Sequence, residues 1–197
     1  MHRHAALEQA TGTFVCYLSD DDLWLPHHLD VLTKLLRKAD FAHTLHTYIK
    51  PDGSINANLG SLNDEQTRNR MLTQKWNFFG PTVVGHTLEI YRRLPYGWHP
   101  APNELWTDLH MWRQFLELRD IRLLSDTTIS SLHFPSSLRH HQTIEESLDE
   151  LAYWWNWLQK DPIELITTLN AQVLNLWNTQ LTWYQNKKLA AKYPQAD

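Results

Sequence analysis

The spacing of apolar residues changes between strand and helix periods along the first two thirds of the chain. A short apolar run, Thr13 to Leu18, follows a helix that ends at Gly12 and predicts a strand buried on both faces of a parallel or mixed sheet. Helical spacing follows from His27 to Ala39, and Phe41 to Ile49 predicts a second strand. Further expected elements are a turn over 51–54, a polar helix over 64–72, a short helix before Pro95, a helix over 104–118 and one or two strands over 121–134.

The last third of the chain has a helical pattern. From Thr143 onward, apolar residues recur every three or four positions, with one break at Asp161-Pro162. The pattern predicts an antiparallel pair of helices that packs on the domain or on a partner. The expected fold class is therefore α/β, with a mixed sheet and flanking helices over 1–141 and an α-helical C-terminal extension over 142–197.

Composition narrows the function classes. The 197 residues include 18 Lys and Arg and 22 Asp and Glu, a net charge of -4 that gives no reason to expect nucleic-acid binding. The single Cys16 excludes an intramolecular disulfide and a cysteine-rich zinc site, and it favours a reducing, cytoplasmic location. No apolar run approaches the roughly 20 residues of a membrane span, so we expect no transmembrane segment.

An acidic cluster follows the first predicted strand. Asp20, Asp21 and Asp22 supply hard oxygen ligands for Mg²⁺ or Mn²⁺, and in open α/β sheets ligands bind beyond the carboxyl ends of strands. The alternative is a solvated turn in which Asp22 caps the next helix. For three aspartates alone, this second interpretation is the better one.

The surrounding residues favour the ligand-binding interpretation. The run from Arg3 to Leu29 resembles the DXD segment of family 2 glycosyltransferases, which have the GT-A fold. The matching features are Arg3, Ala10, Gly12, the apolar strand, the acidic cluster, Leu23-Trp24, Pro26 and His28-Leu29. The resemblance implies a partial GT-A-like domain that uses a nucleotide-diphosphate sugar as donor and Mn²⁺ or Mg²⁺ as cofactor. It implies metal binding at Asp22 or Asp20, with Asp21 as the third candidate, and donor contacts from Asp20, Asp21 and Arg3. Ser19 stands where many members carry Asp, which leaves the choice of metal-binding carboxylate open.

Two later segments extend this resemblance. Asp108 lies near the start of a predicted helix. In the resemblance, family members carry there the general base that activates the acceptor hydroxyl, and Glu104 is the alternative. Simple helix-terminal electrostatics would also explain Asp108. After the last predicted strand, the family often places a His or Arg against the metal or diphosphate. Here the candidates are His133 for the metal and Arg139 for the donor, and the alternative is a polar loop.

The resemblance spans Arg3 to about His141 and covers only the later part of a GT-A domain. We therefore expect an uncovered sheet edge that pairs with a second copy or a missing N-terminal segment, and weak donor binding by the isolated chain. The expected partners are a nucleotide sugar and a glycan or other hydroxyl acceptor. The main alternative is a non-catalytic module that binds a protein partner through its Trp-rich helices. A metal-dependent phosphohydrolase fits less well, because the spaced ligands of a two-metal centre are missing.

Overall fold

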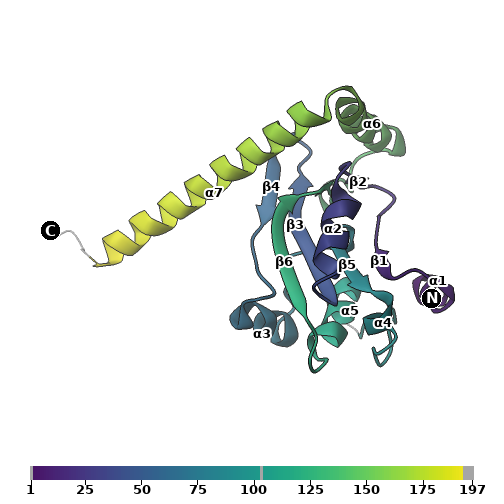
Figure 1. Ribbon diagram of the computed structural model, residues 1–197. Helices are drawn as coiled ribbons and strands as arrows, with labels where there is room; N and C mark the ends of the chain where they lie inside the picture. The colour runs from purple at the N-terminus through teal and green to yellow at the C-terminus, as the bar shows by residue number, and fades with distance from the viewer. Residues whose placement is uncertain (1, 103, 193–197) are drawn as a thin grey trace.

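The computed structural model describes residues 2–102 and 104–192 and has a mixed α/β architecture. A mixed sheet with strand order β1-β5-β3-β4, in which β6 also pairs with β3, forms its centre, and helices flank it (Figure 1). The expected mixed sheet, flanking helices and C-terminal helix are confirmed. The elements are α1 (His2–Gln9), β1 (Phe14–Cys16), β2 (Leu23–Trp24), α2 (His28–Leu36), β3 (Phe41–Ile49), β4 (Ile55–Asn58), α3 (Glu65–Thr73), η1 (Pro81–Val83), β5 (Val84–Thr87), α4 (Leu88–Tyr91), α5 (Thr107–Leu116), β6 (Leu123–Ile129), β7 (Ser131–Leu132), η2 (Ser136–Leu138), α6 (Ile144–Lys160) and α7 (Pro162–Lys192).

Strand β3 is the central strand of the sheet. It pairs in parallel with β6 and antiparallel with both β4 and β5. Seven of its nine residues are buried, including His43, Thr44 and Thr47. Their polar side-chain atoms have hydrogen-bond partners in Thr44 itself and in Ser130 and Ser131. Neighbouring strands pair with β3 along both of its edges.

Strand β1 differs from its expectation. It is shorter than the apolar run around it, its residues are half-buried, and it pairs antiparallel with β5 at the end of the strand order. The prediction of a strand buried on both faces is wrong, because Phe14, Val15 and Cys16 are all only half-buried; within the described residues β5 alone pairs with this strand. Strand β4 was not predicted, since three of the four residues in its sequence, Ile-Asn-Ala-Asn, are Asn or Ala, which are depleted in strands.

Two apolar cores hold the elements together. The first lies around Phe41, Phe79, Trp112 and Phe115 and packs α5 against the sheet. The second joins Ile49 and Leu132 of the sheet region to side chains of the helical extension, namely Trp154, Leu158, Leu165, Leu169 and Val173. The beginning of the extension is therefore anchored on the same sheet that carries the acidic turn.

The extension begins and breaks where its sequence predicts. A capping box between Thr143 and Glu146 begins α6, and Pro162, which has no amide hydrogen to lose, opens α7 directly after Asp161. Helix α7 does not fold back along α6 as the expected antiparallel pair would. It runs on past the sheet, and its last turns project away from the domain (Figure 1). Among the described helices, none is long and apolar enough to span a membrane.

Candidate functional site

The three aspartates of the acidic turn have three different environments. The turn connects β1 to β2, and it leaves Asp20 exposed, Asp21 half-buried and Asp22 buried. Partial burial, reinforced by the neighbouring charge of Asp22, raises the pKa of Asp21. The prediction that Asp22 caps the following helix is wrong, because α2 begins after His27 and its cap makes no side-chain hydrogen bond.

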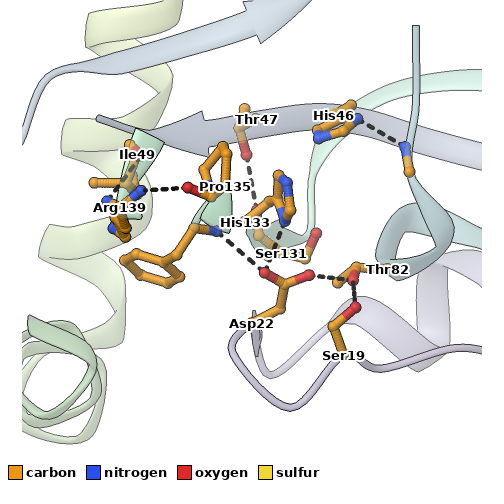
Figure 2. A network of polar contacts seen from close by, with 12 residues as sticks. Ser19, Asp22, His46, Thr47, Ile49, Thr82, Ser131, His133, Pro135 and Arg139 are labelled. Atoms are coloured by element: carbon orange, nitrogen blue, oxygen red, sulfur yellow. Dashed lines mark hydrogen bonds and ion pairs between the residues drawn. The ribbon is translucent and has the colours of Figure 1, made fainter. Parts of the chain in front are cut away.

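Asp22 is held from three sides (Figure 2). Its Oδ1 lies 2.8 Å from Nδ1 of His133 and accepts a hydrogen bond of 3.1 Å from the backbone N–H of Phe134. Its Oδ2 accepts a hydrogen bond from the hydroxyl of Thr82. Burial alone would raise the pKa of this carboxyl, since its side chain has 0% exposure, but the hydrogen bonds from His133, Thr82 and Phe134 outweigh burial and lower it. Asp22 is therefore a buried carboxylate.

A second histidine stands beside this pair. The rings of His46 and His133 meet edge to face, with centroids 5.1 Å apart. Nδ1 of His46 accepts a hydrogen bond of 2.8 Å from the backbone N–H of Gly80, and burial lowers the pKa of His46 to about 3. His46 is thus neutral at ordinary pH. The cavity between these rings and Asp22 measures about 20 Å³, room for a water molecule but not for a sugar.

A larger pocket opens beside the same turn. It has a volume of about 460 Å³ and lies between Asp20 and Asp21 on one wall and the loop into α6 on another. Arg139 lines it but is already engaged: its guanidinium forms a two-bond ion pair with Glu150, at 2.6 and 2.7 Å, and donates to the carbonyl of Ile49 at 3.0 Å. A diphosphate that used Arg139 would have to compete with Glu150.

The second acidic residue of the sequence prediction, Asp108, lies in the first turn of α5. Its Oδ2 accepts a hydrogen bond of 2.9 Å from the amide of Asn77, and its Oδ1 accepts one of 2.7 Å from the backbone N–H of Leu109. Burial raises the pKa of Asp108 despite these hydrogen bonds and the positive charge of Arg3. The alternative base, Glu104, is exposed and has a left-handed backbone with φ of 79°.

Arg3 and Trp98 stand near Asp108. The guanidinium of Arg3 lies over the indole of Trp98, 4.9 Å from the ring centroid, and both line a shallow pocket that also includes Thr107, the neighbour of Asp108. Trp98 is buried and donates a hydrogen bond of 3.0 Å to the hydroxyl of Tyr17, so its ring is part of the core. Trp106 is the exposed indole of this region, at 49%.

One short segment touches both carboxylates. Asn77 at its beginning donates to Asp108, and Thr82 near its end donates to Asp22. Five residue steps of extended chain span at most about 18 Å, so this segment sets an upper limit on the separation of the two anchoring positions. Sequence reasoning missed Asn77, Thr82 and His46. The segment carries mixed strand and turn signals and no recognisable motif, so nothing in it pointed to these contacts.

The side chains around the turn supply too few ligand atoms to hold a metal ion without further ligands from a substrate. Within the described ranges there is no group of three or more His, Cys, Asp or Glu side chains that could hold a metal. Both oxygens of Asp22 already accept hydrogen bonds, whereas Asp20 is exposed and His133 uses only Nδ1 for Asp22. Mg²⁺ and similar ions are commonly held by one or two carboxylates and completed by substrate phosphates. The residues present are compatible with that arrangement and not with a closed protein cage.

Comparison with known proteins adds no family. No protein-family model matches the chain, and no curated protein is similar to it. The class that fold and site define is a mixed α/β protein with a fully buried carboxylate, Asp22, in the turn after β1 and a partly buried one, Asp108, in the first turn of α5.

Proposed function

We propose that the chain is a GT-A-type glycosyltransferase domain, or the acceptor-side part of one, which transfers a sugar from a nucleotide-diphosphate donor to a hydroxyl acceptor. The observation that carries the proposal is the 77–82 segment, which contacts Asp108 and also Asp22, one of the three aspartates of the acidic turn that the resemblance to family 2 glycosyltransferases singles out. Transfer needs a base for the acceptor and a stabilised diphosphate, facing one another across one cleft.

Asp108 is the proposed general base. A base works best when its pKa lies closer to the operating pH than that of a free carboxylate, and burial raises the pKa of Asp108 in that direction. Each of its oxygens accepts one hydrogen bond, from Asn77 and from Leu109, so each keeps a lone pair for an acceptor hydroxyl. These two donors also fix the rotation of the carboxylate.

Asp20, Asp21 and His133 are the proposed donor-side groups. A divalent ion, when bound, would neutralise the charge that develops on the departing nucleoside diphosphate. Asp22 holds His133 through Nδ1, an arrangement that leaves Nε2 as the ligand atom of the ring. The 460 Å³ pocket beside Asp20 and Asp21 offers space for the donor.

Calorimetric titration of uridine and guanosine diphosphate, with and without Mn²⁺, tests the donor side. We expect Mn²⁺-dependent binding that is lost in the double variant Asp20→Asn/Asp21→Asn and kept in Asp30→Asn, an exposed aspartate of α2. Asp108→Asn should bind nucleotide normally and lose transfer. Absence of binding at millimolar nucleotide, or binding that ignores both Mn²⁺ and the double variant, contradicts the proposal.

The second candidate is a non-catalytic assembly module. The observation in its favour is the outer half of α7, which exposes Leu181, Trp183 and Tyr184. Nucleotide binding distinguishes the two candidates, because an assembly module has no reason to bind a nucleoside diphosphate in a metal-dependent way.

A further inference from the structure

The outer half of α7 does not pack against the rest of the domain. Among the described side chains of this helix, Val173 is the last buried one, and every side chain described from Asn178 to Leu189 is exposed. Figure 1 shows this half extending past the sheet. An isolated helix of about 15 residues is marginal in water, so a projecting segment of this length gains from a partner.

A second apolar stripe runs along this half. Leu165, Leu169 and Val173 form the stripe that packs on the sheet. A different set of positions, which we call the outer stripe, follows the alternating four- and three-residue spacing of a coiled-coil seam. The outer stripe consists of Asn170, Leu174, Trp177, Leu181, Tyr184 and Lys188.

Most of the outer stripe is open to solvent. Leu174, Leu181 and Tyr184 are 62%, 57% and 59% exposed, whereas Trp177 is half-buried and packs with part of its surface against the second core. Its inner four positions are apolar and its two ends, Asn170 and Lys188, are polar. This is the pattern of a short seam with an apolar centre and solvated ends.

We propose that the outer stripe pairs with the outer stripe of a second copy of this chain, as an antiparallel two-helix coiled coil. With the twofold axis at Thr179, Leu174 faces Tyr184 of the partner subunit and Trp177 faces Leu181 of the partner subunit. The polar ends match as well, because Asn170 then faces Lys188 of the partner subunit. The stripe is thus complementary to itself in the antiparallel sense.

Charge selects the antiparallel orientation. From Leu165 to Lys192 the chain has no Asp or Glu, and Lys187 and Lys188 lie near the end of the helix. A parallel pair would set these lysines beside their copies, with no Asp or Glu in the outer half of the helix to offset them. An antiparallel pair separates them and brings each lysine-bearing end toward the half of the partner helix that begins with Glu164. It also aligns the two helix dipoles favourably.

The proposed interface is small. Each copy contributes two leucines and two aromatic side chains. The surface area that they bury is at the lower end of the range for specific interfaces. We therefore expect reversible dimerisation, with a dissociation constant on the order of 10 µM. This association is independent of the proposed catalytic activity.

Sedimentation equilibrium of the full chain over about 1 to 300 µM tests the dimer. Leu181→Glu puts two charges into the proposed seam and should weaken association roughly 100-fold or more. Leu189→Glu is the matched control: Leu189 is 54% exposed, belongs to the same helix and lies off the stripe. Both leucines are exposed, so both variants should fold. A monomer at every concentration, or equal association of the two variants, overturns the proposal.

Orientation is tested by cross-linking with a short bis-maleimide in a Cys16→Ser background. Asn170→Cys mixed with Lys188→Cys should cross-link efficiently, whereas neither variant should cross-link with itself. In the proposed register two copies of position 170 lie about 27 Å apart along the axis. Self-cross-linking of Asn170→Cys at the rate of the mixture would indicate a parallel pair and overturn the proposal.

Discussion

Replacement of Asp22 offers the sharpest test of the buried network around the acidic turn. In Asp22→Ala, the ring N–H of His133, the backbone N–H of Phe134 and the hydroxyl of Thr82 all lose their acceptor. A buried donor left without an acceptor costs about 1–3 kcal/mol, and three donors lose their acceptor here, of which the His133 ring is partly exposed. We therefore expect Asp22→Ala to lower the free energy of unfolding by about 3–5 kcal/mol at pH 7.

Asp22→Asn removes the negative charge of the side chain but keeps its shape. Its amide oxygen can still accept from His133 and Phe134, and the Thr82 hydroxyl can turn to accept from the new NH₂ group. What remains lost is the charge assistance of these bonds, so the expected destabilisation is smaller, about 1–2 kcal/mol. Urea unfolding followed by tryptophan fluorescence measures both variants. Asp20→Asn is the control, because Asp20 is exposed, and its effect should stay within about 0.5 kcal/mol.

The pH dependence gives an independent check. Since its hydrogen bonds lower the pKa of Asp22 in the folded protein, the unfolded chain takes up the proton first as the pH falls. The stabilising contribution is complete above the unfolded pKa of about 4 and is lost as the pH falls through the folded pKa. The difference between wild type and Asp22→Asn should therefore shrink below about pH 4. Equal stability of Asp22→Asn and Asp20→Asn at pH 7 would refute the reasoning.

Three further predictions concern the fold around the site. Burial lowers the pKa values of His43 and His86 to about 4, so both resist protonation in the folded state. The stability that they contribute should be complete above about pH 6.5 and should fall as the pH drops toward 4. The melting temperature should therefore decrease over this range, and a flat profile between pH 7 and 5 would contradict the prediction. Gly97→Ala should destabilise by about 2–4 kcal/mol, because a Cβ there would lie 2.5 Å from the Tyr91 hydroxyl at φ of +58°, whereas Gly53→Ala, at φ of +79° with open space, should lose only about 1 kcal/mol in the same thermal melt. Arg139→Ala should destabilise by about 3 kcal/mol through loss of the bidentate pair with Glu150, and a double-mutant cycle with Glu150→Ala by urea unfolding should show clear coupling; additive effects would mean that the pair contributes little.

Local pattern was enough to predict several elements. Strand β3 has the bounds that its sequence predicts, because nine mostly apolar or β-branched residues lie between Asp40 and the Pro51-Asp52-Gly53 turn. Thr143, Glu146 and Pro162 are strong local signals, and the helices begin at them. These features depend on residues within a few positions of one another.

The environment of the site could not be predicted in the same way. Asp20, Asp21 and Asp22 are alike in sequence, yet only Asp22 is buried. Its burial depends on Thr82 and His133, which lie 60 and 111 positions away and therefore leave no local signal. The same holds for Asp108, whose partner Asn77 lies 31 positions earlier. Sequence pattern marked the carboxylates as candidates, but only the packing of distant loops decides which of them is buried and which keeps access to solvent.

The hydrogen bonds that Asp22 accepts also limit the chemistry that is possible at the turn. A carboxylate that accepts three hydrogen bonds and has no exposed surface is poorly placed to bind a ligand directly, because a ligand would first have to displace the donors of the protein. The exposed Asp20, the half-buried Asp21 and the free edge of the His133 ring have no such barrier. Asp22 is therefore better understood as a positioning residue that orients His133 and joins the turn to the 77–82 segment. On that reasoning, Asp20→Asn/Asp21→Asn should abolish metal-dependent binding in a protein of normal stability, whereas Asp22→Asn should impair binding only to the extent that it loosens His133.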